Sequence, residues 1–264
     1  MDNRNNQPKP ELVHKLEGCT DEVNGAVILP GENGVISISN DRSVRLWLLR
    51  DSGQFWPSIC HYMTTAATSL SYCHQKRKLF VGLESGAVEE FTVARDYNRM
   101  DSERLYHAHT ARVTDTVYTE RTNWVLTSGR DKYFQFHCTT TGKRLGGYLC
   151  NAWCTTIAYD EEAQYVFIGD YSGAITVCKL EQSGVNFINT LKVRGRRERR
   201  SLMTDDISGS QREYPLPGLG RGEELVVLRQ LRQLRVCLGY RREARHGVRA
   251  ARPQEQGEQP GLQR

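Results

Sequence analysis

The stretch ISNDRSVRLW, residues 38–47, decides how this sequence folds. Two runs rich in Ile, Val and Leu flank the polar segment Asn-Asp-Arg, a composition typical of two strands joined by a tight turn. A related stretch, TSGRDKYFQFH, occupies residues 127–137 and again places an Asp in the turn. The chain therefore contains the same two-stranded unit more than once.

A second pair of stretches extends this repeat. LFVGLESGAVEEFTV (79–93) and VFIGDYSGAITVCKL (166–180) share a Phe, a Gly and the turn Ser-Gly-Ala. Successive turns are 44, 46 and 41 residues apart, with the turn residues Asp41, Ser85, Asp131 and Ser172. This period is typical of β-propeller blades. No long segment shows an apolar period of 3.6 residues, so we expect an all-β, partial propeller of about four blades over residues 12–192.

The end of the first unit resembles a WD40 repeat, with Asp41 in the turn and Trp47 six residues later. His109 precedes Asp131 by 22 residues, which is similar to the Gly-His…Asp frame of that repeat. In the WD40 family a His, a Ser or Thr, the Asp and the Trp form a buried, hydrogen-bonded tetrad, because buried polar groups must satisfy one another. The resemblance implies structural, non-catalytic roles for Asp41, Trp47, His109, Ser128 and Asp131.

The repeat is kept imperfectly. Cys19 stands where the first His would be, and His137 stands in the Trp position of the third unit. The second and fourth units have Ser instead of Asp, and Phe91 or Cys178 instead of Trp. We therefore expect degenerate tetrads in every unit.

A more specific resemblance is to the family of WD-repeat and FYVE-domain-containing proteins. It is carried by residues 15–59, 80–91 and 169–182, whose order and spacing are similar to the first four blades of that family. The resemblance covers about residues 12–192. It implies a non-enzymatic scaffold of vesicle trafficking and signalling, which docks proteins on the propeller surface and, in a full-length form, lies on early endosomes.

The zinc-bound FYVE finger of that family, which binds phosphatidylinositol 3-phosphate, needs several Cys pairs and a basic motif. This sequence has eight Cys, and none forms a CxxC pair. We therefore expect no zinc or other cofactor in this chain, and membranes containing phosphatidylinositol 3-phosphate as partners only of a full-length form. No stretch resembles a nucleophile elbow or a phosphate loop, so we expect no enzyme activity.

Charge divides the chain near residue 192. Residues 1–192 hold 20 Lys and Arg against 22 Asp and Glu, whereas residues 193–264 hold 16 Arg, no Lys and 9 Asp and Glu. The polar residues 1–11 lack the apolar core of a secretion signal, so we expect a disordered N-terminus and a cytoplasmic protein.

Three interpretations of residues 193–264 are open. The first is a largely disordered, solvated basic tail. The second is an RNA-binding or nuclear segment, because RGRRERR (194–200) would attract phosphates; however, Tyr214 and Tyr240 are the tail's only aromatic residues, and we expect no specific nucleic acid partner. The third is a truncated isoform whose tail is a retained intron followed by out-of-frame coding sequence.

The genetic code supports the third interpretation. Lys-Val-Arg at 192–194 can be encoded with a splice donor after the Lys codon, and Ile-Ser-Gly at 207–209 can be encoded with a splice acceptor. The 49 nucleotides between them would shift the frame by one. With that shift, residues 232–243 can be read as Asp-Asn-Ser-Val-Cys-Val-Trp-Asp, the end of a further WD repeat, about 44 residues after Ser172 once the intron is removed.

Sequencing the spliced transcript across the codon of Lys192 tests this hypothesis. We expect a splice junction directly after that codon and, beyond it, the frame that encodes the further repeat. A mature message that reads through residues 193–264 in the present frame would contradict it.

Overall fold

The computed structural model describes residues 12–29, 31 and 34–192. They form sixteen strands in four antiparallel sheets of four strands each, and this part of the chain contains no helix. The all-β fold of about four blades is thereby confirmed. The expected disorder of residues 1–11 and the expectations for residues 193–264 concern residues outside those described.

Each sheet is a simple meander, with strands paired in chain order. Blade 1 consists of β1 (Val23–Ile28), β2 (Gly34–Ser39), β3 (Ser43–Leu49) and β4 (Phe55–Tyr62). Blade 2 consists of β5 (Ala67–Cys73), β6 (Lys78–Leu83), β7 (Val88–Val93) and β8 (Met100–Tyr106). Blade 3 consists of β9 (Val113–Thr119), β10 (Trp124–Gly129), β11 (Tyr133–Cys138) and β12 (Arg144–Leu149). Blade 4 consists of β13 (Cys154–Asp160), β14 (Tyr165–Asp170), β15 (Ala174–Glu181) and β16 (Gly184–Lys192).

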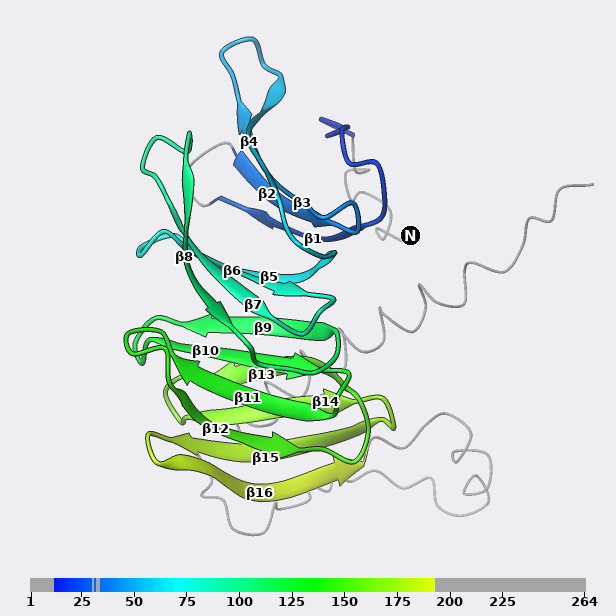
Figure 1. Ribbon diagram of the computed structural model, residues 1–264, viewed down its shortest axis with the longest axis vertical. Helices are drawn as coiled ribbons and strands as arrows, with labels where there is room; N and C mark the ends of the chain where they lie inside the picture. Colours follow the sequence, from blue (N-terminus) through cyan, green and yellow to red (C-terminus); the bar gives the residue numbers. More distant parts are fainter. Residues whose placement is uncertain (1–11, 30, 32–33, 193–264) are drawn as a thin grey trace, which may run out of the picture.

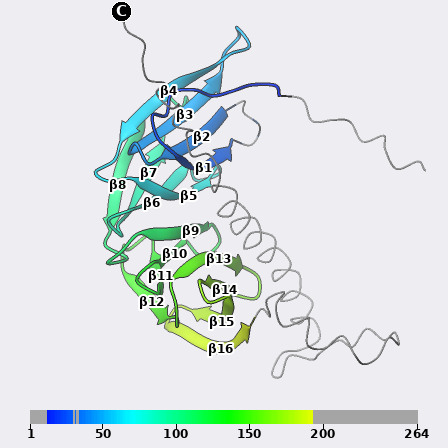
Figure 2. The same cartoon turned by 90° about the vertical axis from the view of Figure 1, so that its right-hand side faces the viewer.

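The four blades follow one another along an arc. Figure 1 shows the sheets stacked in chain order, and Figure 2 shows that the first strand of each blade lies on the concave side and the fourth strand on the convex side. The first strands β1, β5, β9 and β13 are neighbours in space across successive blades. This is the arrangement of propeller blades around a central axis.

The turn between the second and third strand of each blade contains a residue with positive φ. Gly86 has φ 92° and Gly173 has φ 86°, whereas Arg42 and Lys132 adopt φ values of 68° and 71°. At Gly86 a Cβ atom would lie 2.2 Å from the carbonyl oxygen of His109, so only glycine fits there. The same turn therefore presents a cationic side chain in blades 1 and 3 and none in blades 2 and 4.

Packing between blades depends on the alternation of side chains along each second strand. Residues in the register of Ile36 point to the following blade, and the next residue along the strand points to the preceding blade. In blade 3, Leu126, Phe134 and Phe136 pack against blade 4, where Ile168 faces them. Each blade interface is thus an apolar core of its own.

Phe136 tests the contribution of these interfaces to stability. It is 0% exposed, and its ring centroid lies 5.2 Å from that of Trp124. We expect Phe136→Ala to lower the free energy of unfolding by about 3–5 kcal/mol, since it removes buried surface and leaves a cavity. Denaturant unfolding followed by circular dichroism measures this loss.

Phe187→Ala is the matched control, because Phe187 on the outer strand β16 is 50% exposed. We expect it to cost about 1 kcal/mol. Equal effects of the two substitutions would contradict the assignment of the blade 3–blade 4 interface as a core.

Candidate functional site

Blade 3 contains the most complete polar tetrad. His109 Nδ1 lies 3.0 and 3.1 Å from the two carboxylate oxygens of Asp131, and Nε2 lies 3.0 Å from Oγ1 of Thr127. A carboxylate only accepts hydrogen bonds, so Nδ1 carries a proton and donates it. The ring thus links the loop before β9 to strand β10 and to the turn after it.

The hydroxyl in this tetrad belongs to Thr127 and not to Ser128, where the sequence pattern placed it. Ser128 points to the other face of β10, and its Oγ lies 2.9 Å from Oγ1 of Thr114. The reason for this correction is the strand period of two, because neighbouring residues face opposite sides of a sheet.

The Asp131 carboxylate is held by several donors. It accepts hydrogen bonds from the backbone N–H groups of Thr110 and Tyr133, both at 3.1 Å, in addition to the bond from His109. Burial alone would raise the pKa of Asp131, but these bonds and the His109 ring outweigh it, so the pKa lies below its ordinary value.

Blade 1 keeps a different half of the tetrad. Trp47 donates from Nε1 to Oγ of Ser37 at 2.8 Å, and Asp41 accepts from the backbone N–H groups of Thr20 (3.0 Å) and Ser43 (2.8 Å). Burial acts to raise the pKa of Asp41, yet these bonds and the Ser43 hydroxyl lower it to about 2. Cys19 takes the place of the His, so the Asp and Trp halves are not linked through an imidazole.

In blades 2 and 4 the tetrad positions are mostly apolar. The side chains with the register of His, Ser/Thr and Trp are Met63, Val81 and Phe91 in blade 2 and Cys150, Ile168 and Cys178 in blade 4, and all six are buried. The turn carboxylate of blade 4 comes from Asp170, which accepts from the N–H groups of Ser172 and Ala174 at 2.9 and 3.1 Å. Hydrophobic packing therefore replaces the polar tetrad in every second blade.

His137 places a buried polar ring atom in the interior of blade 3. It occupies the Trp position, is 6% exposed, and no partner is recorded for its buried Nδ1 among the described residues. Burial, and to a smaller extent the nearby Arg144 and His109, lowers the pKa of His137 to about 4. The ring is therefore neutral in the folded protein at neutral pH.

The lowered pKa of His137 predicts that the stability of the fold depends on pH. Between about pH 6.5 and 4 the unfolded chain binds a proton on His137 that the folded chain does not, so stability falls as the pH falls through this range. We expect His137→Phe to remove a loss of about 3 kcal/mol between pH 7 and pH 4, measured by denaturant unfolding at each pH.

The exposed His107 provides the control, because His107→Gln changes no buried group. A pH profile that is the same for the parent and for His137→Phe would show that His137 does not carry this dependence.

The ends of the four inner strands form one continuous rim. In each blade the residue before the turn position donates its N–H to the carbonyl of the residue directly before the first strand, over 2.8–2.9 Å. We call these eight residues the rim ladder: Glu22 and Asn40, Ala66 and Glu84, Arg112 and Arg130, Trp153 and Tyr171.

The rim ladder changes in chemical character from blade to blade. Glu84 pairs with Arg112 at 3.0 Å, which joins blades 2 and 3. The guanidinium carbon of Arg130 lies 5.9 Å from the centre of the Trp153 ring, which in turn lies 5.7 Å from the Tyr171 ring. The ladder is thus acidic at blades 1 and 2, basic at blade 3 and aromatic at blade 4.

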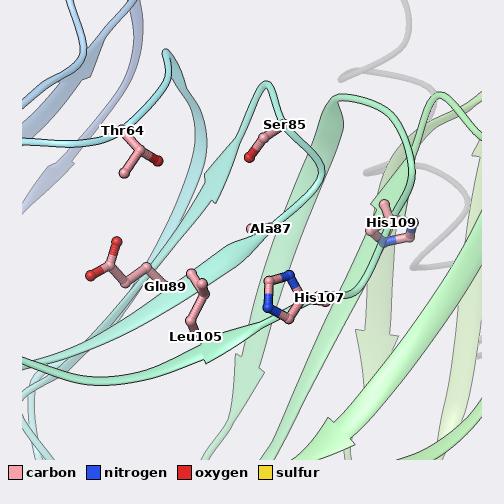
Figure 3. Close-up of a pocket in the computed structure, with 7 residues that line it drawn as sticks. All are labelled: Thr64, Ser85, Ala87, Glu89, Leu105, His107 and His109. Atoms are coloured by element: carbon pink, nitrogen blue, oxygen red, sulfur yellow. The ribbon is translucent and has the colours of Figure 1, made fainter.

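A cleft of about 390 Å³ lies on the same rim, beside the outer strands of blade 2. Figure 3 shows Glu89 and Leu105 on neighbouring strands, with His107 on the segment that leads to blade 3. Its lining residues are Thr64, Ser85, Ala87, Glu89, Leu105, His107 and His109. A carboxylate (Glu89), an imidazole (His107) and two hydroxyls (Thr64 and Ser85) thus border the cleft beside apolar side chains. His109 belongs to the tetrad as well.

The described part of the chain contains no group of three or more His, Cys, Asp or Glu side chains that could hold a metal ion. It also contains no helix long and apolar enough to cross a membrane. Of the site residues expected from the sequence, Asp41 and Trp47 lie in blade 1, and His109 and Asp131 are bonded to each other in blade 3. No residue pattern within a single repeat predicted the positions of the rim ladder.

The chain matches no protein-family model. It is 46% identical over 184 residues to WD repeat and FYVE domain-containing protein 1 of Bos taurus, covering 70% of this chain and 45% of that protein. It is 45% identical over 184 residues to WD repeat and FYVE domain-containing protein 2 of Homo sapiens, covering 70% of this chain and 46% of that protein. It is 37% identical over 183 residues to WD repeat and FYVE domain-containing protein 2 of Caenorhabditis elegans, covering 69% of this chain and 44% of that protein. The chain spans about half the length of these relatives.

Solved structures support the fold alone. The WD40 propeller domain of Doa1 matches with a TM-score of 0.56 at 18% identity, covering 68% of this chain and 57% of that one. Chaetomium thermophilum Sqt1, bound to the N-terminus of ribosomal protein L10, matches with a TM-score of 0.59 at 16% identity, covering 69% and 54%. Over the matched residues, this chain is therefore a WD40 protein homologous to the WD repeat and FYVE domain-containing proteins.

Proposed function

We propose that this protein is a non-enzymatic scaffold that binds other proteins through the rim of its propeller. The observation that carries the proposal is the rim ladder. Its backbone is fixed by four hydrogen bonds of 2.8–2.9 Å, while Arg130, Trp153 and Tyr171 are exposed at its end. Arg, Trp and Tyr are the residues most enriched at the centres of protein interfaces.

The tetrads support a binding role over catalysis. His109 and Asp131 are engaged with each other and with Thr127, and the side chain of His109 is 0% exposed. A buried imidazole whose two nitrogens both have partners holds the blade together and is not open to a substrate. The polar groups that resemble catalytic residues are therefore part of the framework.

We further propose that the protein is an adaptor of vesicle trafficking in the cytoplasm, on early endosomes in a full-length form. The support is the homology to relatives whose names include a FYVE domain. The described residues offer no Cys cluster for a zinc finger. We therefore assign binding to phosphatidylinositol 3-phosphate to a full-length form and to none of the residues that the structure describes.

The alternative is an RNA-binding or nuclear protein that uses its Arg-rich residues 193–264. Deleting these residues separates the two functions. We expect partners identified by cross-linking to the full chain to be captured equally well by the deletion variant, with a weaker dependence on salt than a set of phosphate contacts would give. A variant with Arg196, Arg197, Arg199 and Arg200 changed to Gln serves as a milder control.

The opposite result has a distinct signature. If all binding depends on the tail, capture is lost in both variants, and in the parent it falls steeply between 50 and 200 mM salt, as expected for phosphate contacts. That outcome would replace the scaffold proposal with the RNA-binding one.

A further inference from the structure

The blade 3–blade 4 end of the rim ladder has the composition of a binding site. Trp153 is 48% exposed and Tyr171 is 63% exposed, although their rings contact each other. Arg130, exposed, lies over Trp153, and Lys132 is exposed in the same turn as Arg130. Two aromatic rings and two cations are thus gathered on one edge of two adjacent blades.

The backbone under these side chains is well anchored. Tyr171 donates its N–H to the carbonyl of Trp153 at 2.8 Å, and Arg130 donates to the carbonyl of Arg112 at 2.9 Å. Cys150 donates to the carbonyl of Lys132 at 2.9 Å. The site is therefore pre-organised, which reduces the entropy lost on binding.

The exposed charged side chains at this end of the rim ladder are cations. The nearest turn carboxylates are engaged internally: Asp131 by His109 and two N–H groups, and Asp170 by Ser172 and the N–H of Ala174. Neither Arg130 nor Lys132 forms an ion pair with any residue that the structure describes. A partner that brings carboxylates would therefore meet two exposed cations whose neighbouring carboxylates are already hydrogen-bonded within the blades.

We propose that this end of the rim ladder binds an extended, acidic peptide segment of a partner protein that carries one apolar or aromatic side chain. The carboxylates pair with Arg130 and Lys132, and the apolar side chain packs on Trp153 and Tyr171. An Arg guanidinium forms strong, often bidentate, hydrogen bonds to carboxylates, and exposed aromatic rings supply rigid contact area. The inference rests on the proposed scaffold function and names the partner chemistry for it.

The rest of the ladder favours a peptide over a nucleic acid. Glu84 and Glu22 lie further along the same rim, so a polyanion that followed the rim would meet negative charge within two blades. Trp153 and Tyr171 are one aromatic pair, whereas binding of single strands uses successive aromatic residues on which bases stack. A short peptide with local acidic charge fits this distribution.

Fluorescence anisotropy of the full chain with labelled probes tests the proposal. The probes are heptapeptides of the pattern Gly-Asp-Glu-X-Asp-Glu-Gly, where X is Phe, Trp, Leu or Ala, the same peptides with Lys and Arg instead of the acids, and a seven-nucleotide uridine oligomer. We expect binding of the acidic peptides, weakest with Ala at X. Arg130→Glu and Trp153→Ala should each weaken it about tenfold or more.

Two matched substitutions elsewhere are the controls. Arg50→Glu changes an exposed Arg in the turn between β3 and β4, and Trp56→Ala changes a Trp on β4 that is 62% exposed. We expect both to bind the acidic peptides as the parent does. Thermal melts of the four variants verify that each is folded.

Several results would overturn the proposal. These are no binding of any acidic peptide, equal binding by the parent and by both rim variants, or binding of the basic peptides or the oligonucleotide as tight as that of the acidic ones. If none of the peptides binds but cross-linked protein partners are still captured by the full chain, the scaffold function stands and only this partner chemistry fails.

Discussion

Every described blade interface depends on one constraint: the side chains on both faces of a blade's second strand must be buried. Along β6 and β10 nearly every side chain is buried, because one face packs on the preceding blade and the other on the following blade. A shift of one residue would exchange the two sets of side chains. The tight turns with positive φ and the tetrads fix this register, so they act on packing although they lie at the edge of the sheets.

The alternation of polar and apolar tetrads is a direct consequence of this constraint. In blade 3 a buried His, Thr and Asp satisfy one another, whereas in blade 2 Met63 and Phe91 fill the corresponding space and add to the core with blade 1. Both solutions leave few unsatisfied polar atoms, which is the condition that matters energetically. His137 departs from both solutions, since its ring is polar and its Nδ1 is buried.

The sequence alone predicted the blade fold because turn residues and strand composition are local signals. The spacing of Asp41, Ser85, Asp131 and Ser172 was enough to count four blades. The prediction from the sequence failed at Ser128. Thr127 and Ser128 both fitted the pattern, and only the strand register distinguishes them. The sequence also showed no sign of the role of Asp170, because this carboxylate lies at the end of β14, two residues before the turn position that Asp131 occupies in blade 3.

The rim ladder could not be predicted, since its members come from eight separate places in the chain and share a backbone position and not a residue type. The framework specifies only the backbone there, because Tyr171 and Arg130 use their N–H groups and not their side chains to close the ladder. The side chains at these positions are therefore free to vary without loss of packing, and in this chain they change from Glu84 to Arg130 to Tyr171. A scaffold can thus acquire a particular partner at the rim while the buried faces of its blades stay the same.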